Sequence, residues 1–368
     1  MSIELKELKD YVYLTQGLAI NEGSAHLVSS TKSDDFSLPL LRIADMIENK
    51  YEKYISNKVQ ENVIAKPSDI IYTRTGQIGL VFTGKYGVVH NNSFIVKITN
   101  NSLLPNYLYA ILQSNFVRNQ ALSFAHNSVQ PDLTHDMFKA IKIPIPSKPE
   151  QKKFAYLYSS ITSKIENNIV INNNLQSILN TFYDYNFIKP TQNEVLSEKY
   201  TKILCKDILE IKTGKEDANF GRSNGKYKFF TCSKETLKCD IPAFSGHAIL
   251  ISGNGDFNVK HYCGEFNAYQ RTYVLIPKNY TYYGVLYMAA LKLVNRFKNS
   301  SAGSIVKFIS KSDIENIELI IPNNENLLLS LNKYLHIIEK NEEENEKLIN
   351  IRDFLLPLLM NGQATIEE

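Results

Sequence analysis

The chain has 368 residues, of which 43% are hydrophobic and 21% charged, so it is long enough to form at least two domains with buried cores. The formal net charge of +3 does not by itself indicate nucleic-acid binding, and no run of 18 apolar residues predicts a membrane span. The charged N-terminus lacks the apolar core of a signal peptide, so we expect a cytoplasmic location and reduced thiols at all four cysteines.

Residues 1–149 are predicted to form a first globular domain that is rich in strands and aromatic residues. Gly79 lies in a glycine-containing turn that follows an apolar run. Further along, apolar residues alternate with polar ones from Phe138 to Ile145, and Pro146 follows. Because proline cannot continue a strand ladder, this pattern predicts a strand that ends at Pro146.

Residues 150–190 are predicted to form a long helix. Its apolar residues, from Phe154 to Phe182, fall on alternating steps of four and three, and the two remaining positions of this seam are Asn168 and Asn172. This is a heptad pattern with a polar centre, which is typical of helices that pair in one register.

Residues 195–322 repeat the first domain at an offset of about 176 residues. Ile314 and Ile317 correspond to Phe138 and Ile141, Pro322 corresponds to Pro146, and Gly255 is matched to Gly79. A period of this length is too long for a solenoid and indicates a duplicated domain.

Residues 323–368 are predicted to form a second long helix with a polar middle from Asn341 to Glu346. If the two helices run antiparallel, their polar centres meet. A single amphipathic helix usually covers a globular core, but two helices that each follow a matching strand–proline boundary favour a paired spacer. The positive charge excess lies in the two globular segments, whereas this last segment is acidic.

The order of short motifs resembles the specificity subunits of type I restriction-modification systems. In the first half the motifs are the glycine turn Pro67–Gly79, Asn91–Phe94, Gln130–Leu133, Ile143–Pro146 and Glu150–Gln151. The second half adds Thr213–Lys215, Tyr227–Thr231 and the ending Leu355–Gln363. It departs from the pattern at Ser252–Gly255, which stands in place of the Arg-Thr-Gly turn, and at Asn324–Glu325, which stands opposite Glu150–Gln151.

The resemblance implies an α+β fold with two target-recognition domains separated by two long antiparallel coiled-coil helices. It also implies a non-catalytic subunit in which each domain reads one half of a bipartite, asymmetric site in double-stranded DNA. The helices would dock two methyltransferase subunits, and restriction (translocase) subunits would join the complex. S-adenosylmethionine, ATP and magnesium are expected only in those partners, and this subunit is expected to hold no cofactor or metal.

Candidate DNA contacts are polar side chains in or near glycine-containing turns, because arginine and lysine read guanine whereas asparagine and glutamine read adenine. Arg74 is the foremost of them, because it lies within the motif that carries the resemblance. The candidates in the first domain are Arg74, Gln77, Lys85, His90, Asn92, Asn127 and Gln130. Those in the second are Lys215, Arg222, Lys226, Lys228, Asn254, Lys260, Gln270, Arg271 and Lys307.

Other motifs do not support a catalytic or metal-binding role. The run Gly79–Lys85 fits the start of a phosphate-binding loop, but it is followed by Tyr86, where such a loop needs the hydroxyl of serine or threonine for magnesium. The residues around it also predict a strand and not a strand–loop–helix unit. The second-half cysteines and histidines lack the spacing of a zinc finger. The chain also lacks the Asn-Pro-Pro-aromatic or Asp-Pro-Pro-aromatic motif of amino-methyltransferases. The alternative function is a duplicated coiled-coil adaptor that binds protein partners only, whose affinity for DNA would not fall steeply with salt.

Overall fold

The computed structural model describes residues 4–125, 131–192, 199–222, 224–255, 257–299 and 308–360. The chain divides into two compact units. Unit 1 comprises residues 1–165 and 346–368, and unit 2 comprises residues 166–345. The units cut across the predicted boundaries, because each contains a globular part together with a portion of both long helices. Among the described residues, no helix is both long and apolar enough to cross a membrane.

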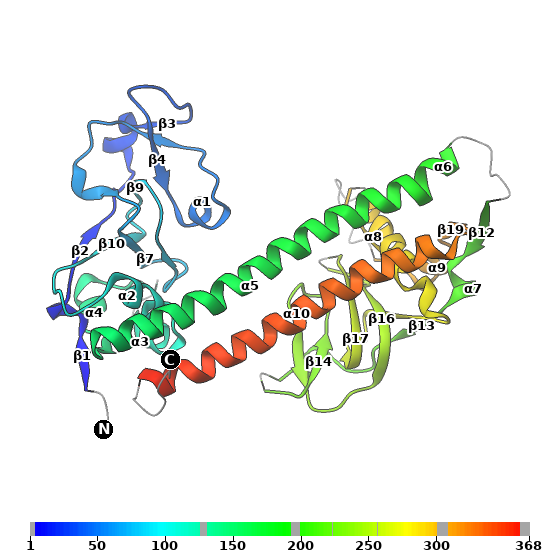
Figure 1. Ribbon diagram of the computed structural model, residues 1–368. Coiled ribbons are helices and arrows are strands. Elements are labelled where there is room, and N and C mark those ends of the chain that lie inside the picture. Colours follow the sequence, from blue (N-terminus) through cyan, green and yellow to red (C-terminus); the bar gives the residue numbers. More distant parts are fainter. Residues whose placement is uncertain are drawn as a thin grey trace. The chain divides into compact units, whose positions relative to one another are not determined.

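Unit 1 contains three sheets with orders β1-β11, β2-β10-β7-β8 and β3-β5-β4-β9-β6 (Figure 1). Its strands are β1 Leu5–Glu7, β2 Val12–Gln16, β3 Val28–Ser29, β4 Leu38–Leu41, β5 Tyr54–Ile55, β6 Ile64–Ala65, β7 Ile70–Thr73, β8 Val81–Phe82, β9 Gly87–Val89, β10 Ser93–Ile98 and β11 Lys142–Pro144. Its short helices are α1 Ile43–Glu48, α2 Pro105–Leu112, α3 Asn115–Ala125 and α4 His135–Lys139. The main core packs the β2-β10-β7-β8 sheet against α2, α3 and the start of the long helix α5, Lys148–Tyr183.

Unit 2 contains two sheets with orders β12-β19 and β13-β18-β16-β17-β14-β15. Its strands are β12 Tyr200–Leu204, β13 Leu209–Thr213, β14 Tyr227–Phe230, β15 Leu237–Cys239, β16 Phe244–Ser252, β17 Val259–Ala268, β18 Thr272–Pro277 and β19 Glu318–Pro322. Its helices are α6 Lys189–Gln192, α7 Cys205–Ile208, α8 Tyr283–Asn299 and α9 Lys311–Glu315, together with part of α10, Glu325–Met360. The core packs α8 between the sheet and the long helices, with Leu179 from α5 and Leu331 and Leu335 from α10.

The duplication is confirmed by sheet order and by backbone hydrogen bonds. The order β13-β18-β16-β17 repeats β2-β10-β7-β8, and the pair β12-β19 repeats β1-β11. In unit 1, Arg74 N donates to Asn92 O at 2.8 Å. In unit 2, Gly253 N donates to Arg271 O at 2.9 Å, so Gly253 is the structural equivalent of Arg74 and Arg271 that of Asn92.

These pairings correct the sequence match of the glycine turns. Since Gly253 corresponds to Arg74, the equivalent of Gly255 is Gly76 and not Gly79. Both glycines have left-handed backbones, with φ of +74° at Gly76 and +71° at Gly255. The match at Gly79 was wrong because the segment between β18 and α9 is three residues shorter than the segment between β10 and α4. The offset is therefore 179 at this turn and 176 only after that segment.

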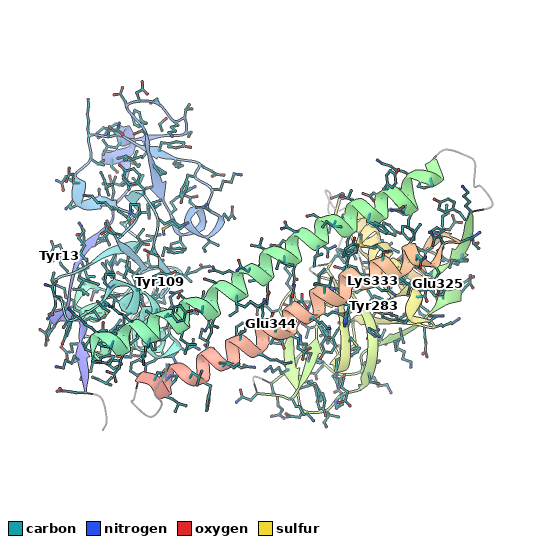
Figure 2. The ribbon with its side chains drawn as sticks, viewed as in Figure 1. Tyr13, Tyr109, Tyr283, Glu325, Lys333 and Glu344 are labelled. Carbon is teal, nitrogen blue, oxygen red and sulfur yellow. The ribbon has the colours of Figure 1, made fainter. Side chains whose placement is uncertain are left out.

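The long helices pack antiparallel, and their polar centres meet as predicted. Asn168 donates to Asn345 Oδ1 and to Glu344 Oε2, both at 2.8 Å, and Glu344 is marked in Figure 2. One turn along α5, Asn172 accepts from Asn341 Nδ2 at 2.7 Å. Later residues of α5 therefore meet earlier residues of α10. Asn168 is buried, so these bonds satisfy polar groups that would otherwise disfavour this register.

In each unit, one buried side-chain amide on a long helix bonds the backbone at the start of a shorter helix. In unit 1, Gln151 of α5 accepts from Leu104 N at 2.8 Å, at the start of α2, and donates to Ser102 O at 2.8 Å. In unit 2, Asn332 of α10 accepts from Gly284 N at 2.7 Å and donates to Tyr280 O at 2.7 Å. Asn332, and not Asn324–Glu325, thus takes the structural role of Gln151.

Candidate functional site

Arg74 lies at the start of the turn after β7, and every part of its guanidinium contacts the protein. Its Nη2 lies 2.5 Å from Asp132 Oδ2, its Nε donates to Leu133 O at 3.2 Å and its Nη1 to Asn91 O at 3.4 Å. The guanidinium also lies over the Phe94 ring, 5.4 Å from the ring centroid. Only 14% of the side chain is exposed.

The motifs that carried the resemblance therefore meet around one side chain. The Asn91–Phe94 segment and Asp132–Leu133 are distant in sequence from the Arg-Thr-Gly turn, yet both contact the guanidinium of Arg74 in that turn. This geometry gives Arg74 a structural role in unit 1. That Arg74 also reads a base stays a prediction.

The other candidates in unit 1 lie in two places. Gln77 is exposed in the same turn as Arg74, and Asn92 and His90 lie in the adjoining turn between β9 and β10. Burial lowers the pKa of His90 and the nearby charge of Arg42 lowers it further, against a smaller opposing effect of Asp45, which favours the neutral imidazole. Lys85 lies apart, where its Nζ donates to Asn49 Oδ1 at 3.0 Å beside α1.

In unit 2, three predicted contacts come together at the equivalent turn. Asn254, Gln270 and Arg271 line one cavity with a volume of about 420 Å³. Cys232, which follows β14, contacts two residues of the lining: its Sγ lies 3.3 Å from Asn254 Oδ1 and 3.5 Å from Arg271 O. The side chains of Gln270 and Arg271 are exposed.

Lys228 and Lys260 line a second cavity of unit 2, of about 350 Å³, together with residues of α5 and α10. Lys228 lies over the Tyr262 ring and Lys260 over the Phe230 ring, at 4.9 and 5.6 Å from the centroids. Lys260 Nζ also donates to Ser233 O at 2.7 Å. Burial lowers the pKa of Lys260 to about 8.

The remaining candidates are not gathered with these two groups. Lys215 and Lys226 are exposed, and Lys226 lies over its neighbour Tyr227. Arg222 pairs with Asp240 at 3.4 Å on the β15 side of the sheet. The candidates Asn127, Gln130 and Lys307 lie outside the described residues.

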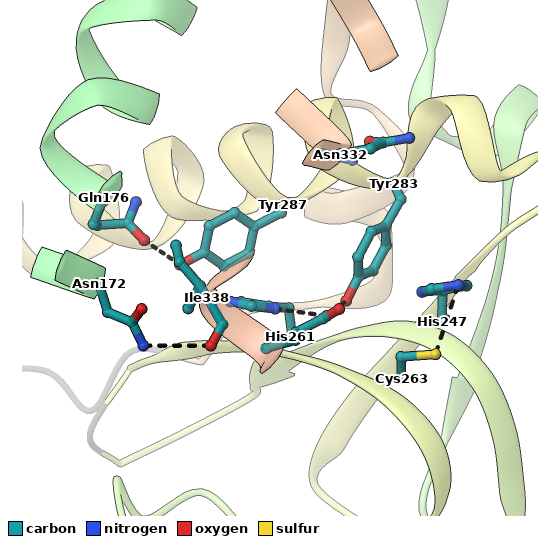
Figure 3. Close-up of polar contacts among 11 residues, drawn as sticks. Asn172, Gln176, His247, His261, Cys263, Tyr283, Tyr287, Asn332 and Ile338 are labelled. Atoms are coloured by element: carbon teal, nitrogen blue, oxygen red, sulfur yellow. Dashed lines mark hydrogen bonds and ion pairs between the residues drawn. The ribbon is translucent and has the colours of Figure 1, made fainter. Parts of the chain in front are cut away.

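A polar cluster that the sequence analysis did not identify attaches α10 to the sheet of unit 2. Glu339 lies 3.0 Å from His261 Nδ1 on β17 and accepts from the Tyr283 hydroxyl on α8 at 2.6 Å. Its partners His261 and Tyr283 are labelled in Figure 3. Burial alone would raise the pKa of Glu339, but the hydrogen bonds from His261 and Tyr283 outweigh it, and the pKa lies below its ordinary value. This cluster holds the sheet that carries both cavities. Neither Glu339 nor Asn332 could be recognised from sequence spacing, because their partners are remote. Gln151 lies in a motif of the resemblance, but its role could not be predicted, because its partners Leu104 and Ser102 are also remote.

Two further expectations concern the discounted motifs. The Gly79–Lys85 run contains strand β8, as predicted, and no helix follows it directly. In the part of the chain that the structure describes, no group of three or more metal-ligating side chains is present.

The duplicated fold matches one protein family twice. The family model described as the type I restriction modification DNA specificity domain matches residues 4–177 and again residues 197–350. The chain belongs to this family. The two matches coincide with the two copies of the strand framework and include most of α5 and α10.

Similar members of the specificity-domain family are known from bacteria and archaea. The Escherichia coli type I restriction enzyme EcoDI specificity subunit is 34% identical over 168 residues, which are 44% of this chain and 38% of that subunit. The MjaIX specificity subunit of Methanocaldococcus jannaschii is 25% identical over 325 residues, covering 76% of this chain and 73% of that protein. The crystal structure of a type I S subunit from M. genitalium has the same fold, with a TM-score of 0.62, 16% identity and coverage of 99% of this chain and 97% of that one.

Proposed function

We propose that this chain is the DNA-recognition subunit of a type I restriction-modification complex. Each globular part reads one half of a bipartite, asymmetric DNA site, and α5 and α10 form a coiled-coil spacer that docks two methyltransferase subunits. Restriction subunits join through that complex. This chain has no catalytic role, and S-adenosylmethionine, ATP and magnesium act in the partner subunits.

The observation that carries this proposal is one backbone framework, built twice, with different side chains at equivalent positions. Arg74 is replaced by Gly253, and Asn91–Asn92 by Gln270–Arg271, although the backbone hydrogen bonds are repeated. Base identity is read by polar side chains at turns of this kind, so two different sets of side chains favour two different half-sites.

The test is to express the chain with its methyltransferase partner in a host that lacks modification, and to sequence the methylated bases. We expect one bipartite motif with two unlike halves. The purified complex should bind this motif with an affinity that falls steeply as salt rises, because phosphate contacts release counterions. Absence of any modified motif, with DNA binding that does not depend on salt, would instead indicate the protein-only adaptor.

Exposed apolar residues on the long helices lead to a prediction about the methyltransferase partner. Tyr156 and Phe354 in unit 1 and Ile169 and Ile178 in unit 2 are exposed, whereas Leu157 is half-buried. Because such residues on a polar helix mark interaction surfaces, the isolated chain should aggregate, and co-expressed methyltransferase should keep it in solution.

A substitution tests this surface directly. The change Tyr156→Ser together with Phe354→Ser should weaken co-purification of the methyltransferase at least tenfold. The control is Ile241→Ser, which removes a similarly exposed apolar side chain that lies between β15 and β16 and not on either long helix. A lone chain that is monodisperse, or a double variant that retains its partner, contradicts the prediction.

The pKa of Lys260 predicts a pH dependence of DNA binding. Because burial brings this pKa to about 8, the ammonium is charged below that pH and loses its proton as the pH rises through it. If it neutralises a phosphate, the affinity for DNA should fall between pH 7 and 9, by up to about tenfold per pH unit above 8. Lys260→Arg should remain flat over this range, since arginine stays protonated. A wild-type affinity that is also flat would leave Lys260 with a purely structural role.

A further inference from the structure

The cavity at the turn after β16 has a counterpart in unit 1 that is filled. Leu133 N donates to Arg74 O at 3.0 Å, and Ile309 N donates to Gly253 O at 2.9 Å, so Phe308 is the equivalent of Asp132. Both members of the Arg74–Asp132 ion pair are thus different in unit 2, where Gly253 stands in place of Arg74 and Phe308 in place of Asp132.

The strand register identifies the base of the cavity. Phe94 pairs with Tyr72 in unit 1 and Tyr273 with Ile251 in unit 2, which makes Tyr273 the equivalent of Phe94. The Phe94 ring lies under the Arg74 guanidinium, whereas the Tyr273 ring lines the cavity. Removal of the guanidinium therefore leaves an aromatic surface available to a ligand.

The glycine also keeps this space free of side chain. A Cβ at Gly253 would lie 2.8 Å from Arg271 O and 3.2 Å from the Tyr273 ring. A side chain at this position would force the backbone or the ring to shift. The side chain of Phe308 at the rim is 69% exposed, so its ring is accessible to a ligand.

The chemistry of the rim decides between ligands. An arginine supplied by another protein would find no carboxylate, because Phe308 stands where unit 1 has Asp132, and no acidic residue is among the described residues that line the cavity. A neutral group with an apolar edge beside hydrogen-bonding atoms fits better. In the major groove an A·T pair offers the thymine methyl group beside adenine N6 and N7.

Resting on the function proposed above, we propose that this rim reads an A·T pair in the half-site recognised by unit 2. Phe308 packs against the thymine methyl group. The carboxamide of Gln270, which is exposed, bonds adenine N6 and N7, and Asn254 supports the same turn. Unit 1 reads its half-site without such a pocket, because the ion pair occupies the equivalent place.

The test uses the complex with its methyltransferase and duplexes that carry the methylated motif. Each thymine of the motif is replaced in turn by uracil, which lacks only the methyl group. For the wild type, one such replacement, confined to one half-site, should weaken binding about fourfold, the effect of losing one buried methyl group. Phe308→Ala should bind the normal duplex about as weakly and should not respond to that replacement. Ile241→Ala, another exposed apolar side chain that is absent from the cavity lining, should respond as the wild type does.

A second arm tests the amide. Replacing the paired adenine by 7-deazaadenine should weaken binding by the wild type and leave Gln270→Ala unaffected. If Phe308→Ala and Gln270→Ala respond to the altered bases as the wild type does, or no uracil matters, the inference is wrong while the proposed function stands. If the wild-type complex does not distinguish the motif from a scrambled duplex, the proposed function itself fails.

Discussion

Substitution of Arg74 by glycine should destabilise unit 1 by about 2–4 kcal/mol, because it breaks an ion pair and leaves Asp132 with a charge that lacks its partner. The side chain of Asp132 is partly exposed, which keeps the effect below that of a fully buried pair. The double variant Arg74→Gly with Asp132→Phe reproduces the residues of unit 2. It should recover part of the lost stability, since no uncompensated charge remains.

Denaturant unfolding of the wild type, both single variants and the double variant forms a complete cycle for the Arg74–Asp132 pair. We expect a coupling free energy of about 1–3 kcal/mol between the two positions, as for other contacting charged residues. The sequence prediction that Arg74 reads a base has a different outcome. In that case Arg74→Ala, besides its effect on unfolding, relaxes one base of a single half-site in the methylated motif, whereas Asp132→Asn leaves that base specificity unchanged.

Substitution of Gln151 by alanine should cost about 3 kcal/mol in unit 1, and Asn332→Ala should cost a similar amount in unit 2. Gln151 is 0% and Asn332 2% exposed, and each accepts from a backbone N–H group at the start of a helix. Without the amide these buried donors have no acceptor, and each unsatisfied group costs about 1–3 kcal/mol.

The measurement is hydrogen exchange of α2 and α8 in the two variants. Exchange should rise in α2 for Gln151→Ala and in α8 for Asn332→Ala, with the other unit unchanged. Asn174→Ala, at an exposed amide of α5, is the matched control and should leave both helices protected. Uniform loss of protection in both units for either variant would contradict the assignment of one amide to each unit.

Local patterns in the sequence predicted much of this architecture. The two long helices, the meeting of Asn168 and Asn172 with the polar centre of the second helix, and a strand near each proline all follow from periodicity and proline chemistry. The predicted end of the first of these strands was wrong, because β11 ends at Pro144 and not at Pro146. The family could be recognised for a related reason, because its motifs recur in a fixed order along the chain.

Tertiary structure alone decided the roles of individual side chains. Asp132 is 58 residues from Arg74, and Leu104 is 47 residues from Gln151, so no local pattern links them. The pairing of Gly76 with Gly255 likewise depends on which backbone groups bond across strands. Periodicity reports which face of an element is buried, whereas the partner of a guanidinium or an amide is set by contacts between distant segments. The sequence therefore determined the duplicated frame, and packing determined that Arg74 fills in unit 1 the space that Gly253 leaves open in unit 2.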